Sequence, residues 1–277
     1  MANRNFHVHL VSDSTGETVS SVARACLVQY EGIFVQEHVW SLVRTPGQME
    51  KVMQAVERDR GPVLYTLVDP ELRDVVRDHC RRLQLPCVGV LDQAMSVLAV
   101  HFHSKSEQWP GRQHQLDEGY FDRIDAMHYT LAHDDGQSTH DLEDADVILV
   151  GPSRTSKTPT CVYLANRGVR AANVPLVPAV PPPVELEEAK RPLIVGLITD
   201  PERLVQIRVN RLRLLQRETE TDYTDMERVQ REIQEARRLY ARRKWATIDV
   251  TRRSIEETAA AILQMLATRR DQRLQAG

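Results

Sequence analysis

The sequence predicts an α/β protein with two parallel-sheet units that follow one another along the chain. Two observations lead to this fold class: apolar runs alternate with amphipathic, helix-like segments, and this alternation stops once at a polar stretch and then resumes. A chain of 277 residues is long enough for two modest domains, each with its own core. We expect an N-terminal α/β domain at 1–103, a linker and helix at 104–140, and a second domain at 141–277.

The first unit is predicted from four apolar runs. Strands are expected at 6–11, 34–43, 63–68 and 87–91. Helices are expected at 19–30, 47–60, 70–83 and 93–102. Pro70 suits the first turn of its helix, because the missing N–H has no partner there. Strands that alternate with helices in this way form βαβ units and a parallel sheet.

The second unit follows a polar stretch at 103–118, which we interpret as a linker. A helix is expected at 120–137, running into an acidic turn. Further strands are expected at 145–151, 171–178, 192–200 and 246–250, with helices at 159–168, between 201 and 245, and from 254 on. The Pro-rich stretch 177–186 is predicted to be extended. Ser254 and Glu257 have the spacing of a capping box. The sequence shows no internal repeat.

Composition excludes several classes of protein. Hydrophobic residues make up 42% of the chain and charged residues 27%, which excludes a mostly disordered chain, a collagen-like chain and a coiled-coil rod. No apolar run reaches the roughly 18 residues of a membrane span. The first residues have neither the apolar core of a signal peptide nor the composition of a transit peptide. We therefore expect a cytoplasmic protein that does not contact a membrane.

Cysteine and histidine spacing does not favour a metal site. The four cysteines form no C-x-x-C pair and are interpreted as small buried residues; they are Cys26, Cys80, Cys87 and Cys161. No H-E-x-x-H motif occurs. His101, His103 and His114 fall in a stretch predicted to be a polar loop, so metal binding there is disfavoured. No structural metal is expected.

Charge is distributed unevenly along the chain. The whole chain has 36 basic and 39 acidic residues, a net charge of −3. Residues 201–277 hold 17 basic and 12 acidic residues, which gives +5, so residues 1–200 carry −8. The basic excess fits nucleic acid, phosphate ligands or an acidic partner, and equally a set of solvated helix faces. Aromatic residues are only 5%, and the basic residues are interleaved with acids, which disfavours nucleic acid.

The most informative segment has the pattern strand, G-x-x-x-x-S-K-T, helix. It nearly matches the phosphate-binding loop G-x-x-x-x-G-K-[ST], in which backbone N–H groups and a helix N-terminus surround a phosphate. The predicted nucleotide-binding residues are Gly151, Pro152, Ser153, Arg154, Thr155, Ser156, Lys157 and Thr158. Lys157 would reach the β-phosphate, and the Thr158 hydroxyl would bind Mg²⁺. The second domain is therefore predicted to be a P-loop kinase-like α/β unit.

One departure from this pattern is Ser156, which stands where the second glycine is usual. Serine tolerates positive φ less well than glycine. The alternative interpretation is a Ser/Thr-rich turn without a ligand.

Acidic groups near the loop are candidates for metal binding and proton transfer. Asp134 and Asp135 precede the loop's strand, and either could accept the proton of an attacking hydroxyl. Asp200 ends a later strand and could hold Mg²⁺ through water. Arg154 could neutralise charge on the transferring phosphoryl group. The alternative for each acid is a capping or solvated role, which is common at strand ends and turns.

A second turn has a similar composition. Ser12, Ser14, Thr15 and Gly16 lie between the first predicted strand and helix, where hydroxyls and a glycine suit an anion. A capped turn without a ligand is the alternative. The basic run Arg208, Arg211 and Arg213 could close on phosphates, or could be one helix face in water.

Long stretches of the chain resemble one known family. They are SDSTGET at 12–18, HDDG at 133–136, the segment 151–178, ITDPERLVQIRVNRL at 198–212 and IDVTRRSIEETAAAIL at 248–263. These segments resemble the pyruvate, phosphate dikinase regulatory protein family, over nearly the whole chain. A sister branch of that family regulates phosphoenolpyruvate synthase, and the segment 166–178 looks more like the dikinase branch.

The resemblance implies a bifunctional enzyme. In one direction such proteins use ADP to phosphorylate a threonine beside the catalytic histidine of the dikinase. In the other they use inorganic phosphate to remove that group and release pyrophosphate. The resemblance also implies that the loop 151–158 binds ADP, and the family accepts Ser or Gly at the position of Ser156. The same loop could serve both directions, with inorganic phosphate in the β-phosphate position of ADP.

Three hypotheses of function are compatible with the residues alone: a protein kinase, a kinase for a small metabolite and a nucleotide-sensing module. A protein kinase predicts an open site with a docking surface, whereas a P-loop kinase for a small metabolite predicts a lid over a closed pocket. A nucleotide-sensing module would bind ADP without transfer. A GTPase is disfavoured because no Asn-Lys-x-Asp motif occurs. A homo-oligomer is compatible with the sequence.

Overall fold

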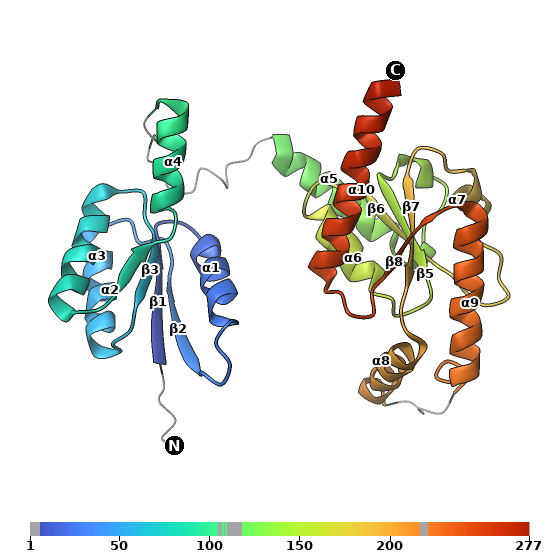
Figure 1. The fold of residues 1–277 in the computed structure, drawn as a ribbon, viewed down its shortest axis with the longest axis horizontal. Coiled ribbons are helices and arrows are strands. Elements are labelled where there is room, and N and C mark those ends of the chain that lie inside the picture. The colour runs from blue at the N-terminus through green and yellow to red at the C-terminus, as the bar shows by residue number, and fades with distance from the viewer. Residues whose placement is uncertain (1–5, 105–106, 108, 110–117, 217–220, 277) are drawn as a thin grey trace. The chain divides into compact units, whose positions relative to one another are not determined.

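A computed structural model describes residues 6–104, 107, 109, 118–216 and 221–276. The chain forms two compact units, residues 1–115 and 116–277 (Figure 1). Each contains a four-stranded parallel sheet flanked by helices, so the predicted α/β class with two parallel-sheet units is confirmed. Among the described residues, no helix combines the length and apolar character that crossing a membrane requires.

The first unit has the strand order β2-β1-β3-β4. Its strands are β1 (Phe6–Ser12), β2 (Val35–Trp40), β3 (Val63–Thr66) and β4 (Cys87–Gly89). Its helices are α1 (Glu17–Leu27), α2 (Pro46–Arg58), α3 (Pro70–Leu83) and α4 (Asp92–Phe102). Helix α1 covers one face of the sheet, while α2 and α3 cover the other (Figure 1).

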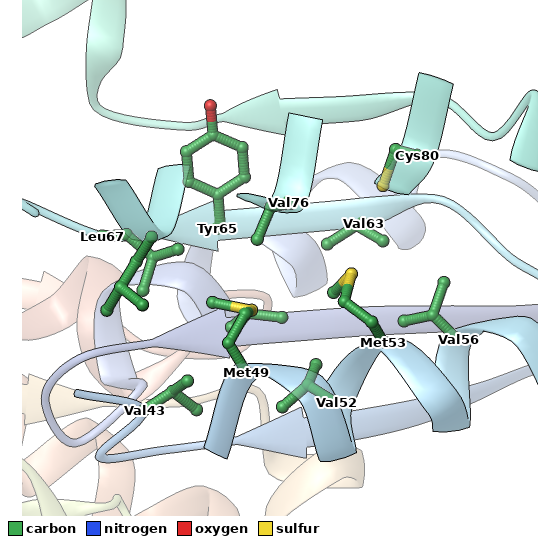
Figure 2. Packing of buried hydrophobic residues seen from close by; sticks show 12 residues of the cluster. Val43, Met49, Val52, Met53, Val56, Val63, Tyr65, Leu67, Val76 and Cys80 are labelled. Carbon is green, nitrogen blue, oxygen red and sulfur yellow. The ribbon is translucent and has the colours of Figure 1, made fainter. Parts of the chain in front are cut away.

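The core of the first unit is concentrated under α2 and α3. Met49, Met53 and Val56 recur at helical spacing on α2 and point toward the sheet, where Val63 meets them (Figure 2). Cys80 of α3 closes the same core. Burial of each such side chain contributes about 1.5–3 kcal/mol, and this packing holds the inner strand β3 against α2 and α3.

The cysteines behave as predicted at two of their four positions. Cys80 and Cys161 are buried, and burial raises the pKa of the Cys80 thiol to about 12. Cys87 is half-buried, and Cys26 is exposed on α1, which the sequence interpretation did not anticipate. Of the three histidines considered above, His101 lies in α4 and not in a loop, whereas His103 is the C-cap residue that follows the helix. The third, His114, falls outside the described residues.

The second unit has the strand order β6-β5-β7-β8. Its strands are β5 (Val147–Gly151), β6 (Ala171–Pro175), β7 (Leu193–Ile198) and β8 (Ala246–Asp249). Its helices are α5 (Glu118–Ala132), α6 (Lys157–Ala165), α7 (Val184–Glu188), α8 (Pro201–Leu214), α9 (Met226–Arg243) and α10 (Ile255–Ala276), with short 3₁₀ turns at Asp134–Gly136 and Leu142–Asp144.

The central strand β5 of this sheet is buried along its whole length. Leu149 packs toward α6 and α10, while Val150 packs toward α7 and α9. From α9, the Tyr240 hydroxyl lies 3.2 Å from the carbonyl oxygen of Val150 and 3.3 Å from that of Leu197. Its ring lies against Gly196, where a Cβ would come within 2.4 Å of a ring carbon. Buried packing on both faces therefore fixes the end of β5, from which the candidate site begins.

Several boundaries differ from the sequence predictions for physical reasons. The second unit begins before residue 141, because α5 packs against α6 and β6. For example, Thr130 on α5 donates to the carbonyl oxygen of Ala171 at 2.8 Å. The Pro-rich stretch is not extended to its end, because the short helix α7 begins in it at Val184 and buries Leu186. The predicted capping box is confirmed, since Ser254 N–H donates to Glu257 and Glu257 N–H donates back to Ser254 Oγ.

Candidate phosphate-binding site

The loop at 151–158 leaves β5 through a position that only glycine fits. A Cβ on Gly151 would lie 2.6 Å from the carbonyl oxygen of Leu197. Beyond it, Arg154 (φ 73°) and Ser156 (φ 61°) are left-handed. Ser156 is also the N-cap of α6 and makes no side-chain cap bond. The backbone thus curls as a phosphate-binding loop requires, and the first N–H groups of α6 have no side-chain cap.

Lys157 begins α6 and is buried inside the loop. Its side chain is 5% exposed, and its ammonium donates to the carbonyl oxygen of Pro152 at 2.9 Å. Burial lowers the pKa of Lys157 to about 8, although nearby carboxylates, foremost Asp135, oppose that shift. The helix was predicted to begin at residue 159, but α6 begins two residues earlier, at Lys157. A buried ammonium with a carbonyl partner gains a full counter-charge when an anion enters.

The predicted acids and the loop threonine come together. Thr158 Oγ1 donates to Asp134 Oδ1 at 2.8 Å. The amide of Asn173 lies 2.6 Å from the same oxygen and 3.1 Å from Asp135 Oδ1. The helix expected at 120–137 instead ends at Ala132, and a 3₁₀ turn with Asp135 at φ 50° presents both carboxylates. We call Asp134, Asp135, Thr158 and Asn173 the acidic cluster.

Oxygen atoms of the acidic cluster have the chemistry that Mg²⁺ requires. Magnesium commonly binds one or two carboxylates together with substrate phosphates. Asn173 is 1% exposed, and its Oδ1 is buried with no hydrogen-bond partner among the described residues. The Asn173 Nδ2 faces the two carboxylates and the Thr158 hydroxyl and orients them, and those oxygens fit a cation that arrives with a phosphate.

Asn173 was missed in the sequence analysis. It is the single polar side chain in the strand Ala171–Pro175, whose other residues are apolar. A single amide side chain in an otherwise apolar, buried strand was the signal in the sequence that could have identified Asn173 as a site residue. Its importance depends on the register, which sets Asn173 opposite Leu149 of β5.

Arg208, from the predicted basic run, lies against the loop. It is 2% exposed and forms two hydrogen bonds with Glu232, at 2.8 and 3.0 Å. It also donates to the carbonyl oxygens of Ser153 at 3.2 Å and of Tyr223 at 3.1 Å, and its guanidinium carbon lies 4.4 Å from the centre of the Tyr223 ring. Arg211 and Arg213 are exposed on α8, so the run divides between a buried loop contact and a solvated face.

A family described as kinase/pyrophosphorylase matches residues 8–263 of this chain. The chain belongs to that family.

Individual relatives support the same membership over the full length. A protein of Rhodospirillum rubrum is 54% identical over 268 residues, which cover 97% of this chain and 98% of the relative. One of Bradyrhizobium diazoefficiens is 48% identical over 273 residues, covering 98% of each chain. Both carry the name "Putative pyruvate, phosphate dikinase regulatory protein". The resemblance to that family inferred from the motifs is confirmed.

Two further residues predicted for the site, Arg154 and Asp200, make no contact with the acidic cluster among the hydrogen bonds of the described residues. Arg154 is exposed at the tip of the loop, where its guanidinium is accessible to a phosphate. Asp200 caps α8, since its Oδ1 accepts from Arg203 N–H at 3.1 Å, while its own N–H donates to Thr251 at 2.8 Å. The capping alternative therefore describes the contacts of Asp200, and its metal-binding role stays a prediction.

The second turn of hydroxyl residues also forms a concave site. Ser12, Ser14, Thr15 and Gly16 line a cavity of about 290 Å³ at the ends of β1 and β3. Ser12 Oγ accepts from Ser14 N–H at 3.1 Å and from Thr66 Oγ1 at 3.0 Å. The hydroxyl of Ser12 is thus engaged in holding the turn, and anion binding here stays a prediction.

Proposed function

We propose that this protein is a bifunctional regulator of pyruvate, phosphate dikinase in the cytoplasm. In one direction it transfers the β-phosphoryl group of ADP to a threonine of the dikinase. In the other it removes that group with inorganic phosphate and releases pyrophosphate. The observation that supports the proposal most is Lys157, buried in a loop whose Thr158 is joined to Asp134. The names of the relatives favour the dikinase over phosphoenolpyruvate synthase as the target.

Each direction can be written so that atoms balance. In the kinase direction the threonine oxygen attacks the β-phosphorus, the bond from that phosphorus to the bridging oxygen breaks, and AMP leaves. In the reverse direction an oxygen of inorganic phosphate attacks the phosphothreonine phosphorus, the bond to the threonine oxygen breaks, and pyrophosphate leaves. The travelling phosphoryl group occupies the same place in both. This balance puts inorganic phosphate where the α-phosphate of ADP lies, and not in the β-phosphate position expected from the sequence, because the transferred group itself occupies the β position over Lys157.

The roles of the residues follow from their geometry. Lys157 and the loop N–H groups bind the transferred phosphoryl group, and Arg154 neutralises its outer oxygens. Thr158 and Asp134 would hold Mg²⁺, which would neutralise phosphate charge when bound, and Asn173 Nδ2 orients both side chains. Asp135 is left as the carboxylate that accepts the threonine proton and returns it to the alkoxide in phosphorolysis.

The proposal is tested with purified dikinase and labelled nucleotide. We expect label from the β-phosphate of ADP on a dikinase threonine, no label from ATP, and pyrophosphate when phosphate is added to the modified dikinase. Label in a small molecule instead would favour a metabolite kinase. Binding of ADP without transfer to any acceptor would favour a nucleotide-sensing module. Transfer to phosphoenolpyruvate synthase alone would move the target to the sister branch.

A further inference from the structure

A cavity of about 500 Å³ lies beside the first half of the phosphate-binding loop. The loop contributes Ser153, and α8 contributes Arg208. One wall is the segment 176–178 that follows β6, and the opposite wall is α9 with Arg228 and Arg231. The proposed roles of Lys157 and the acidic cluster use none of this space.

The wall formed by α8 and α9 is fastened to the loop. Arg208 holds Glu232 of α9 with one side of its guanidinium and reaches the Ser153 carbonyl with Nη2. The Tyr223 hydroxyl and the Ser153 hydroxyl are hydrogen bonded at 3.2 Å, and the Tyr223 ring stacks on Arg208. Because Arg208 and Glu232 are both largely buried, these contacts hold the α8 and α9 wall of the cavity in a fixed position relative to the loop. A molecule bound in the cavity is therefore held at a fixed distance from the loop.

The lining combines three kinds of chemistry. The wall at 176–178 is Leu-Val-Pro, and Val177 is 53% exposed. Arg228 and Arg231 supply cations, and Glu235 supplies an anion one turn beyond Arg231. Arg228 is paired with Asp222 at the rim, and both side chains are more than half exposed. An apolar shelf beside charges of both signs, open to solvent, fits an extended polypeptide segment better than a small metabolite, which needs enclosure.

The cavity contacts the loop near its start, at Ser153, and the acidic cluster includes its last residue, Thr158. The cavity touches Ser153, near the end of β5, whereas Thr158 of the cluster lies within α6. In phosphoryl transfer the attacking and leaving oxygens approach the phosphorus roughly in line, from opposite sides. Because Asp135 takes the threonine proton in the proposed function, the acceptor side of the phosphoryl group is the side that faces Asp135. A segment docked in the cavity at Ser153 therefore runs along the loop to that side.

We propose that this cavity docks the segment of the protein substrate that flanks the acceptor threonine. An apolar residue of that segment lies on the shelf at 176–178, and its charged groups face Arg228, Arg231 and Glu235. Arg208 is a positioning residue, because it acts on the loop through Ser153. The inference rests on the proposed function and adds to it a surface that selects a protein acceptor.

Two variants test the docking, with a control on the same helix. Val177→Trp fills the exposed shelf without entering the core, and Arg231→Glu reverses one charge of the wall. Arg238→Glu is the control, because Arg238 is exposed on α9 and does not line the cavity. The measurements are the KM for dikinase in both directions, the KM for ADP and for phosphate, and the affinity for ADP by calorimetry without dikinase.

We expect both variants to raise the KM for dikinase about tenfold in both directions, which corresponds to about 1.4 kcal/mol. The affinity for ADP should stay within about twofold, since neither Val177 nor Arg231 belongs to the phosphate-binding loop. A tenfold loss of ADP affinity would mean that the cavity holds the nucleotide, and unchanged constants for dikinase would mean that it holds nothing; either result overturns the docking. A wild-type protein that binds ADP but transfers nothing to dikinase overturns the proposed function as well.

Discussion

The two sheets of this protein use the same backbone arrangement for different ends. In each, the first strand of the unit is central, and the turn after it ends in a left-handed residue that is the N-cap of a helix: Gly16 (φ 84°) and Ser156 (φ 61°). The first turn engages its side chains internally, as when Asp13 accepts from Val68 N–H at 2.7 Å. The second places a buried lysine in the loop. The backbone has a similar shape in the two turns, so the difference between them lies in their side chains.

The largest difference between the turns should appear when that lysine is removed. We expect Lys157→Ala to lower both transfer to dikinase and phosphorolysis about a thousandfold, because a buried charge at the transferring group is lost. Lys51→Ala, an exposed lysine of α2 in the first unit, should leave both rates within about twofold. Steady-state assays of both directions give the comparison. Full phosphorolysis by Lys157→Ala would show that the two directions do not share the loop.

The first residue of each turn offers a test of stability. In Gly151→Ala the new Cβ would meet the Leu197 carbonyl, so we expect a loss of about 2 kcal/mol in the free energy of unfolding. Ser12→Ala removes one acceptor in a buried turn and should cost about 1 kcal/mol. Calorimetric unfolding of both variants shows which substitution costs more free energy of unfolding. A smaller cost for Gly151→Ala would mean that β5 and β7 can separate at this point.

The lysine also predicts a pH dependence that the first turn lacks. The pKa of Lys157 is lowered to about 8 by burial, so the ammonium in the free protein loses its proton as pH rises through that value. Binding of ADP needs the charged form, and its affinity should fall about tenfold between pH 7 and pH 9. Titration calorimetry across this range measures it. The arginine variant, Lys157→Arg, keeps its charge and should flatten the profile; an equal fall in that variant would assign the effect to another group.

The smallest expected effect comes from exchanging the two left-handed caps. A non-glycine residue in this conformation costs about 1–2 kcal/mol, and glycine recovers most of that while losing about 0.5–1 kcal/mol of chain entropy. Ser156→Gly should therefore stabilise the second unit by about 0.5 kcal/mol, and Gly16→Ser should destabilise the first by a similar amount. Chemical unfolding curves can resolve the two signs. Equal signs for both variants would indicate that cap hydrogen bonding outweighs backbone strain.

Much of this architecture could be predicted from the sequence because it depends on local signals. Apolar runs located all eight strands of the described residues, and Ser254 with Glu257 marked the start of α10. The loop 151–158 was found because its residues are contiguous and each has a chemical reason to be there. Helix α7 was missed because its proline-rich surroundings favour extended chain, and burial of Leu186 outweighs that preference.

Contacts between distant segments could not be predicted in the same way. Asn173 reaches the loop only through the register of β6 with β5, and Arg208 reaches Ser153 only because α8 returns over the end of the sheet. The sequence could not separate Arg208 from Arg211 and Arg213, since all three have the same charge on one helix. Burial divides them, and burial is a property of the assembled unit.

The left-handed serine has a consequence for how such loops are recognised. A search pattern that demands glycine at the sixth position of the loop passes over this chain, although its backbone there has the dihedral angles that glycine usually provides. The requirement lies in the conformation and not in the residue type, so a pattern that allows serine, asparagine or aspartate at that position would recover loops whose small cost in strain is met by the packing around them.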